Sequence, residues 1–255
     1  MVKKLFKYEF AAFSRVLIPV YVAMGGIAVL SRILQIFSNE TSASSMLLGS
    51  SIFMYAIAVI TAFGFVNVFA VVRFYKNMFT GEGYLTLTLP VTAAEHIWTK
   101  LLSAMLFNLF SVIAFVVSIS IITAGDLFTE IFKSLVYEVK RYCESESVNF
   151  WFNLFEIVLN IVLSTASTIL LFYTCLSIGQ LSKKNRILSA VGVYFAYIFG
   201  IQILGSVVMA MFLETDFMVD FIEFIFDKQY ILQGGLAIAF FFITRHILTN
   251  KLNLE

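Results

Sequence analysis

Residues 46–72 read MLLGSSIFMYAIAVITAFGFVNVFAVV and contain no Asp, Glu, Lys or Arg. An α-helix rises about 1.5 Å per residue, so about 20 consecutive apolar residues cross a bilayer core of about 30 Å. This run exceeds that length and holds no charge that would need solvation. It therefore predicts a transmembrane helix and indicates that lipid is the solvent around this protein.

The whole chain has the same character. Of its 255 residues, 60% are hydrophobic and 13% are charged, and 29 are phenylalanine. Soluble domains carry about 25% charged residues, so this composition excludes a water-soluble protein. The net charge of +1 gives no reason to expect a nucleic-acid partner. Cys143 and Cys175 belong to no CxxC or metal-spaced cluster, so the sequence predicts neither a disulfide framework nor a metal site.

Five further apolar stretches have about the length of a span. Arg32 lies near the end of the first and Arg245 near the end of the last, where a long side chain can reach the interface. With residues 46–72, these stretches predict an all-α integral membrane protein of six spans, organised as a single transmembrane domain over residues 1–255. The five other spans are residues 16–37, 101–125, 157–181, 187–213 and 229–248.

The basic residues predict the orientation, because cytoplasmic loops carry an excess of Lys and Arg. Six spans place both termini and the loops 73–100 and 182–186 on one side of the membrane. Most of the 17 basic residues fall on that side: Lys3, Lys4, Lys7, Arg15, Arg73, Lys76, Lys100, Lys183, Lys184, Arg186, Arg245 and Lys251. Both termini are therefore predicted to be cytoplasmic.

Three segments outside the spans have amphipathic patterns. Residues 1–15 place Val2, Leu5, Phe6, Phe10 and Phe13 near one helical face, which predicts an interfacial helix on the inner leaflet. Two segments on the outer side predict amphipathic or re-entrant helices at the outer leaflet, with ordinary interfacial connectors as the alternative. One carries an apolar stripe from Phe128 through Phe132, Val136 and Val139 to Tyr142, and the other an acidic stripe at Asp216, Asp220, Glu223 and Asp227.

The sequence lacks the motifs of membrane enzymes and of ion-coupled carriers. HExxH and GxSxG are absent, the second to fifth spans hold no charge, and His96 and His246 have no metal partner at ligand spacing. Catalysis by this chain is therefore not expected. If the protein moves a substrate uphill, ATP is the expected energy source. The chain has no GxxxxGK[ST] phosphate loop, so a separate polypeptide must hydrolyse that ATP.

The loop 73–100 is the best place for such a polypeptide to dock. Phe74–Phe79 predicts a short helix that Gly81 and Gly83 end, and the alternating YLTLTLP of residues 84–90 predicts an extended link. Thr92 and Glu95 have capping-box spacing and predict the start of the helix that becomes the third span. A well-capped loop without any partner is the alternative.

The order of these parts resembles membrane subunits of ATP-binding-cassette transporters of the ABC-2 type. The loop sequence EGYLTLTLPVTAAEHIWTK is similar to the corresponding loop of permeases from Gram-positive bacteria, and the small permeases of phenol-soluble-modulin exporters are a similar group within the family. The resemblance implies a bacterial plasma-membrane protein that pairs with a second copy of itself or a similar permease. A cytoplasmic ATPase subunit would bind ATP and Mg, and this chain would bind no cofactor.

The resemblance also implies roles for individual residues. A coupling helix over Tyr75–Tyr84 would contact the ATPase, and spans two and five would line the substrate path and face the partner permease. The implied coupling residues are Tyr75, Lys76, Phe79, Glu82 and Tyr84. The implied path residues are Phe63, Asn67, Phe195 and Gln202, and the small residues for helix packing at the dimer interface are Gly192, Ala196 and Gly200.

Some of these residues have a second interpretation. Asn67 and Gln202 are equally suited to hydrogen bonds between helices, and the phenylalanines suit lipid contact as well as a hydrophobic cargo. Two functions follow from the sequence. The first is an ATP-driven exporter of a hydrophobic or amphipathic substrate, such as a peptide toxin, drug or lipid. The alternative is a non-transporting scaffold or immunity-type factor that binds a peptide or partner protein in the membrane.

Overall fold

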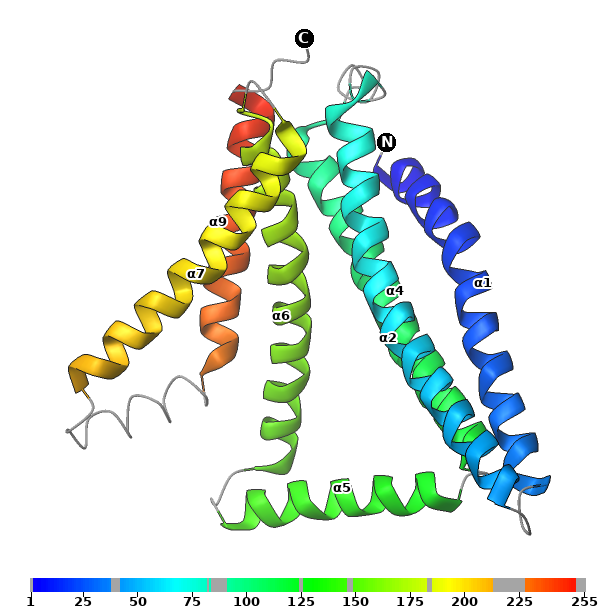
Figure 1. The fold of residues 1–255 in the computed structure, drawn as a ribbon. Helices are drawn as coiled ribbons and strands as arrows, with labels where there is room; N and C mark the ends of the chain where they lie inside the picture. The colour runs from blue at the N-terminus through cyan, green and yellow to red at the C-terminus, as the bar shows by residue number, and fades with distance from the viewer. Residues whose placement is uncertain are drawn as a thin grey trace. The chain divides into compact units, whose positions relative to one another are not determined.

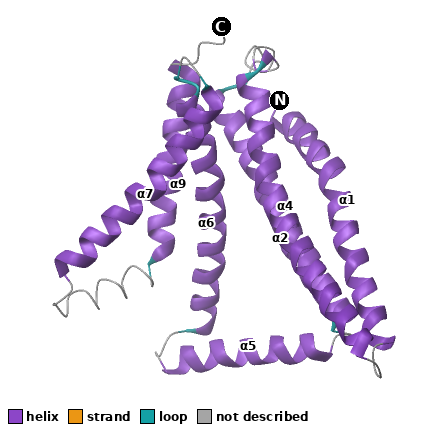
Figure 2. Cartoon of the chain, viewed as in Figure 1, coloured by secondary structure: helices purple, strands orange, loops and turns teal. Residues whose placement is uncertain are grey.

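The computed structural model of the chain describes residues 2–37, 42–81, 83, 91–123, 126–145, 149–182, 185–212 and 228–250. Within these ranges the chain forms helices joined by turns, and no strand occurs in them (Figure 2). The helices, labelled in Figure 1, are α1 (Val2–Phe37), α2 (Ser42–Phe79), α4 (Ala93–Ile122), α5 (Asp126–Ser145), α6 (Phe150–Gly179), α7 (Arg186–Phe212) and α9 (Gln229–Asn250).

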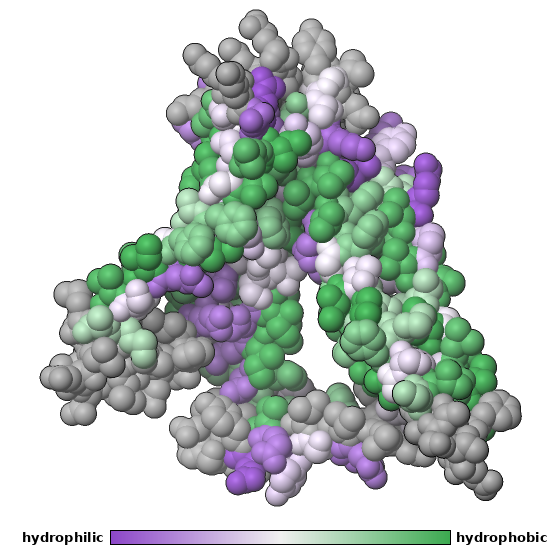
Figure 3. Space-filling model, viewed as in Figure 1, coloured by the Kyte–Doolittle hydropathy of each residue, from purple (hydrophilic) through white to green (hydrophobic). Residues whose placement is uncertain are grey.

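Six of these helices are long and apolar enough to cross a membrane, namely α1, α2, α4, α6, α7 and α9. Each of them contains most of one predicted span, so the sequence located the spans correctly. The protein is a multi-pass membrane protein. Figure 3 shows hydrophobic residues spread over the outward surfaces of these helices, as lipid contact requires.

The first helix differs from the prediction. α1 is unbroken from Val2 to Phe37, so the structure has no break between the predicted interfacial helix and the first span. Pro19 lies inside α1, where it cannot donate a backbone hydrogen bond, and α1 is visibly curved (Figure 1). Phe13, predicted to face lipid, is 1% exposed. The same apolar face serves for contact with protein.

The chain divides into two compact units. Unit 2 comprises Lys3–Ala70 and Leu102–Phe155, so it contains α1, most of α2 and α4, and α5. Unit 1 comprises Met1–Val2, Val71–Leu101 and Glu156–Glu255, so it contains the end of α2, the start of α4, most of α6, and α7 and α9. α2, α4 and α6 therefore contribute to both units.

Unit 2 is held together by aromatic rings and by hydroxyl groups that bond between helices. The ring of Phe13 lies 4.9 Å from that of Phe69 and 5.2 Å from that of Phe107, which joins α1 to α2 and α4. Further along, the hydroxyl of Tyr55 lies 2.6 Å from that of Ser118. Each hydroxyl thereby satisfies a polar atom that lipid cannot solvate.

Unit 1 is built on a parallel pair, α6 and α9, joined by polar contacts at successive levels. The residues in contact rise together along both helices, which shows that the helices run in the same direction. From one end to the other, the contacts are Glu156 to Lys228 at 3.6 Å, Asn160 to Gln229 at 3.4 Å, Ser167 to Gln233 at 2.5 Å and Thr174 to Thr244 at 3.0 Å.

α7 packs on this pair with one face only. Gly179 of α6 lies directly against Ala190, and the ring of Tyr194 stacks on Phe172 with the ring centroids 5.4 Å apart. The ring of Tyr197 meets Phe240 of α9 edge-on. The opposite face of α7 has no neighbour in the part of the chain that is described.

Candidate functional site

The candidate coupling site lies where α2 ends and α4 begins, within unit 1. Sequence analysis expected a short, separate helix here, but α2 continues without a break from Ser42 to Phe79. Tyr75, Lys76 and Phe79 therefore form the last turns of a membrane-spanning helix. Glu82, Tyr84 and the predicted extended stretch 84–90 lie outside the described residues, so the structure does not test them.

Aromatic packing fixes the end of α2. Phe74 is fully buried and its ring stacks on Tyr173 of α6, with centroids 3.9 Å apart and planes 8° from parallel. Phe79 is 6% exposed and meets the ring of Phe74 edge-on. Phe79 therefore stabilises the helix end, whereas Lys76 is exposed and Tyr75 half-buried, so these two remain accessible to a partner.

The turn after α2 requires a glycine. The amide of Gly83 donates to the carbonyl of Thr80 at 2.7 Å, which turns the chain back toward the end of the helix. A Cβ at position 83 would lie 2.5 Å from the carbonyl oxygen of Met78. Because backbone atoms cannot yield like the tip of a side chain, any other residue would displace the turn.

The predicted capping box at the start of α4 is confirmed. The Thr92 amide donates to the Glu95 carboxylate at 2.8 Å, and the Glu95 amide donates to the Thr92 hydroxyl at 3.3 Å. The Thr92 hydroxyl lies 2.9 Å from the same carboxylate. These bonds satisfy the amides that the first turn of a helix leaves without partners, so α4 begins at a defined position.

A buried lysine joins the two helix ends. Lys100 is 3% exposed. When the Asn77 side-chain amide is oriented so that both its oxygen and its nitrogen form hydrogen bonds, the oxygen accepts from the Lys100 ammonium at 3.2 Å. The Asn77 side-chain nitrogen then donates to the Arg73 carbonyl at 3.3 Å. In the sequence, Lys100 served the predicted orientation and the loop that carries the resemblance, whereas Asn77 was not predicted to have a role. The available signal was the four-residue spacing of Lys100 from His96, which is also buried.

These residues comprise an accessible pair, Tyr75 and Lys76, and buried residues beneath it. The accessible residues lie at a helix end, and the buried residues connect that end to α4 and α6. No family model, curated protein or solved structure matches this chain. In the described ranges, no group of three or more His, Cys, Asp or Glu is placed to hold a metal ion.

The predicted path residues lie on two helices in different units. On α2, in unit 2, Phe63 is half-buried beside Phe115, and the Asn67 amide donates to the Phe63 carbonyl of its own helix at 3.0 Å. On α7, in unit 1, Phe195 is 52% exposed and Gln202 is exposed. Asn67 is thus partly satisfied by its own helix.

The predicted small residues of α7 lie on its open face. Gly192, Ala196 and Gly200 are exposed, and a Cβ added at either glycine would meet nothing within 4 Å. Phe195 and its neighbour Phe199 flank them, with ring centroids 6.5 Å apart. This open face, opposite Ala190 and Tyr194, is the α7 surface available to lipid, cargo or another chain.

Proposed function

We propose that this chain is the permease subunit of an ATP-driven exporter whose ATPase is a separate cytoplasmic protein. One observation carries the proposal: α2 extends as a single helix from Ser42, within the first predicted outer loop, to Phe79 in the predicted docking loop. A continuous helix transmits a displacement of its end along its whole length. Force applied near Tyr75 and Lys76 is thereby applied to the second span itself.

The supporting contacts distribute that displacement to other spans. The Phe74–Tyr173 stack ties the end of α2 to α6, and the Asn77–Lys100 hydrogen bond ties it to α4. A partner that moves the loop would therefore move the ends of three spans together. Closely packed interiors respond to such shifts by switching between discrete arrangements, because they are not continuously deformable.

ATP and Mg belong to the partner in this proposal, since the sequence has no phosphate loop. The open face of α7 would meet a second permease copy or the cargo. Its exposed phenylalanines, small residues and Gln202 suit a hydrophobic or amphipathic substrate. The sequence pattern of basic residues supports a plasma-membrane location with both termini inside.

Purification from native membranes tests this proposal. We expect a cytoplasmic ATPase to co-purify with the tagged chain, and its ATP hydrolysis to be stimulated by the chain in reconstituted vesicles. Lys76→Glu reverses the charge of an exposed residue at the proposed docking site, so we expect it to reduce that stimulation about fivefold or more, a usual size for coupling between sites.

Lys7→Glu is the matched control, because Lys7 is also exposed and is predicted to lie on the same side of the membrane. It should leave the stimulation unchanged. Absence of any bound ATPase, with Lys76→Glu behaving as wild type in every assay, would contradict the exporter proposal. That result would favour the scaffold or immunity-type alternative.

A further inference from the structure

α5 connects two candidate membrane spans, α4 and α6, which would place it at the membrane surface. α4 is a candidate span that ends at Ile122, and α5 begins at Asp126. The three residues between them reach at most about 11 Å, so the start of α5 cannot leave the level at which α4 ends. Four residues likewise separate Ser145 from the start of α6 at Phe150. Figure 1 shows α5 running across the direction of α4.

The two edges of this helix differ in charge. Phe132, Val136 and Val139 lie on its apolar face, and Lys133 and Lys140, two turns apart, line one edge of that face. On the other edge, Glu138 pairs with Arg141 at 3.9 Å. Lys133 and Lys140 form no ion pair within the described part of the chain, and the exposed Glu130 lies one turn before Lys133.

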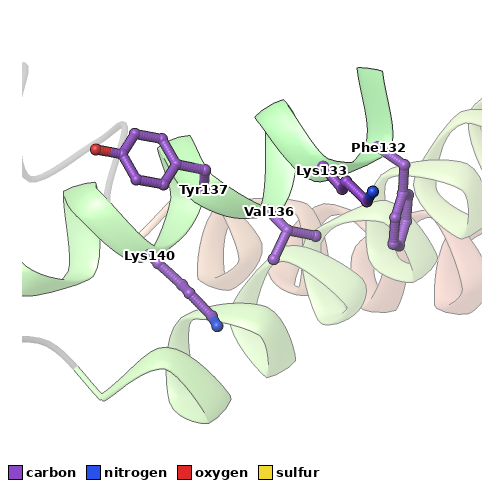
Figure 4. Close-up of a pocket in the computed structure, with 5 residues that line it drawn as sticks. All are labelled: Phe132, Lys133, Val136, Tyr137 and Lys140. Carbon is purple, nitrogen blue, oxygen red and sulfur yellow. The ribbon is translucent and has the colours of Figure 1, made fainter. Parts of the chain in front are cut away.

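A shallow pocket lies along the basic edge. It has a volume of about 250 Å³ and is lined by Phe132, Lys133, Val136, Tyr137 and Lys140. Figure 4 shows Phe132, Val136 and Lys140 projecting from the same side of α5. Phe132 is 58% exposed and Tyr137 is 65% exposed, so two large and mostly exposed rings border the pocket.

We infer that this pocket binds an anionic phospholipid of the leaflet that α5 borders. The lipid phosphate would lie between the ammonium groups of Lys133 and Lys140, and the upper part of an acyl chain would cover Phe132 and Val136. Lysines at the edge of an apolar helix face reach the phosphate level while their stems stay in the apolar region. Tyr137 belongs at the same level, because aromatic rings with a polar tip favour the membrane interface.

Charge and position favour this occupant over a soluble one. The pocket lies on a helix between two candidate spans, where lipid headgroups would be at high local concentration, and its two charged side chains, Lys133 and Lys140, are both cationic. This inference does not depend on the proposed exporter function, because it uses only α5 and its connections. Its failure would leave that proposal unaffected.

Lipid titration of the purified full-length protein, followed by native mass spectrometry, tests the inference. The probes are phosphatidylglycerol and phosphatidylcholine with identical acyl chains. We expect the wild type to retain phosphatidylglycerol in preference to phosphatidylcholine. The double variant Lys133→Gln, Lys140→Gln should need about 25-fold more phosphatidylglycerol for the same occupancy, about fivefold for each lysine removed. The preference should also weaken as salt is raised, because these charges are exposed.

Arg141→Gln is the matched control, since it removes one positive charge from the opposite edge of the same helix and should leave retention unchanged. Unfolding temperatures equal to that of the wild type would show that the exposed substitutions preserve the fold.

Unchanged phosphatidylglycerol retention by the double variant would overturn the inference. Equal losses for both lipids would overturn it too, because headgroup recognition would then be absent. If the double variant kept the lipid but lost binding of an acidic amphipathic peptide, the pocket would be a peptide site instead.

Discussion

At the scale of single residues, one glycine sets how closely α7 approaches α6. A Cβ on Gly179 would lie 2.6 Å from the Cβ of Ala190 and 2.7 Å from its backbone nitrogen. Because one of these atoms belongs to the backbone, the helices themselves would have to separate. Gly179→Ala should therefore destabilise the protein by roughly 1–3 kcal/mol, the usual cost of overpacking, and lower its thermal unfolding temperature in detergent.

Gly192 provides the internal comparison, because it is also a helical glycine but has open space around it. Gly192→Ala should leave the unfolding temperature unchanged or raise it slightly, since alanine favours a helix over glycine by about 1 kcal/mol. Equal drops in unfolding temperature for the two variants would mean that the contact between α6 and α7 is not as described.

At the scale of helices, Thr174 is a buried member of the polar contacts between α6 and α9. Its hydroxyl lies 3.0 Å from that of Thr244 and 3.1 Å from the Phe240 carbonyl. Valine keeps the shape of threonine but removes the hydroxyl. Thr174→Val should therefore destabilise the protein by roughly 1 kcal/mol, and a double-mutant cycle with Thr244→Val should give a coupling of about 0.6 kcal/mol, a typical value between membrane helices.

Thr168 on the same helix is the control, because it is exposed and its hydroxyl donates to the Ser164 carbonyl of α6 itself. Thr168→Val should change the free energy of unfolding by less than about 0.5 kcal/mol. A coupling of zero between Thr174 and Thr244, measured by reversible unfolding, would contradict the contact.

At the scale of the whole molecule, the open face of α7 predicts where a second copy would meet this one. Ala196 lies on that face and Ala190 on the packed face of the same helix. In a chain with both native cysteines replaced, Ala196→Cys should form a disulfide-linked dimer when membranes are oxidised. Ala190→Cys should not, because Gly179 covers it. Gel electrophoresis without reductant separates the disulfide-linked dimer from the monomer. If Ala196→Cys gave a monomer band alone, this interface would be contradicted.

The sequence was sufficient for features that local patterns determine. Apolar runs of span length, four of them free of charge, matched the six long apolar helices, and the spacing of Thr92 and Glu95 located the start of α4. It was insufficient where an apolar residue has two possible neighbours. Phe13 was expected against lipid and Phe79 against a partner, yet both are buried within the chain. In a membrane protein, lipid and protein interior attract the same side chains, so periodicity alone cannot separate the two.

The parallel arrangement of α6 and α9 has a consequence for biosynthesis. α6 enters the membrane before α9 exists, and its hydroxyls already have bonds of their own: Ser167 to the Ser164 carbonyl at 3.0 Å and Thr174 to the Leu170 carbonyl at 2.8 Å. A hydroxyl can form its hydrogen bond with a backbone carbonyl of its own helix in this way. The side chains of Gln229 and Gln233 are longer, and their amide oxygens accept hydrogen bonds from residues of α6. The later helix, α9, thus brings its longer polar side chains to a neighbour that is already in the membrane.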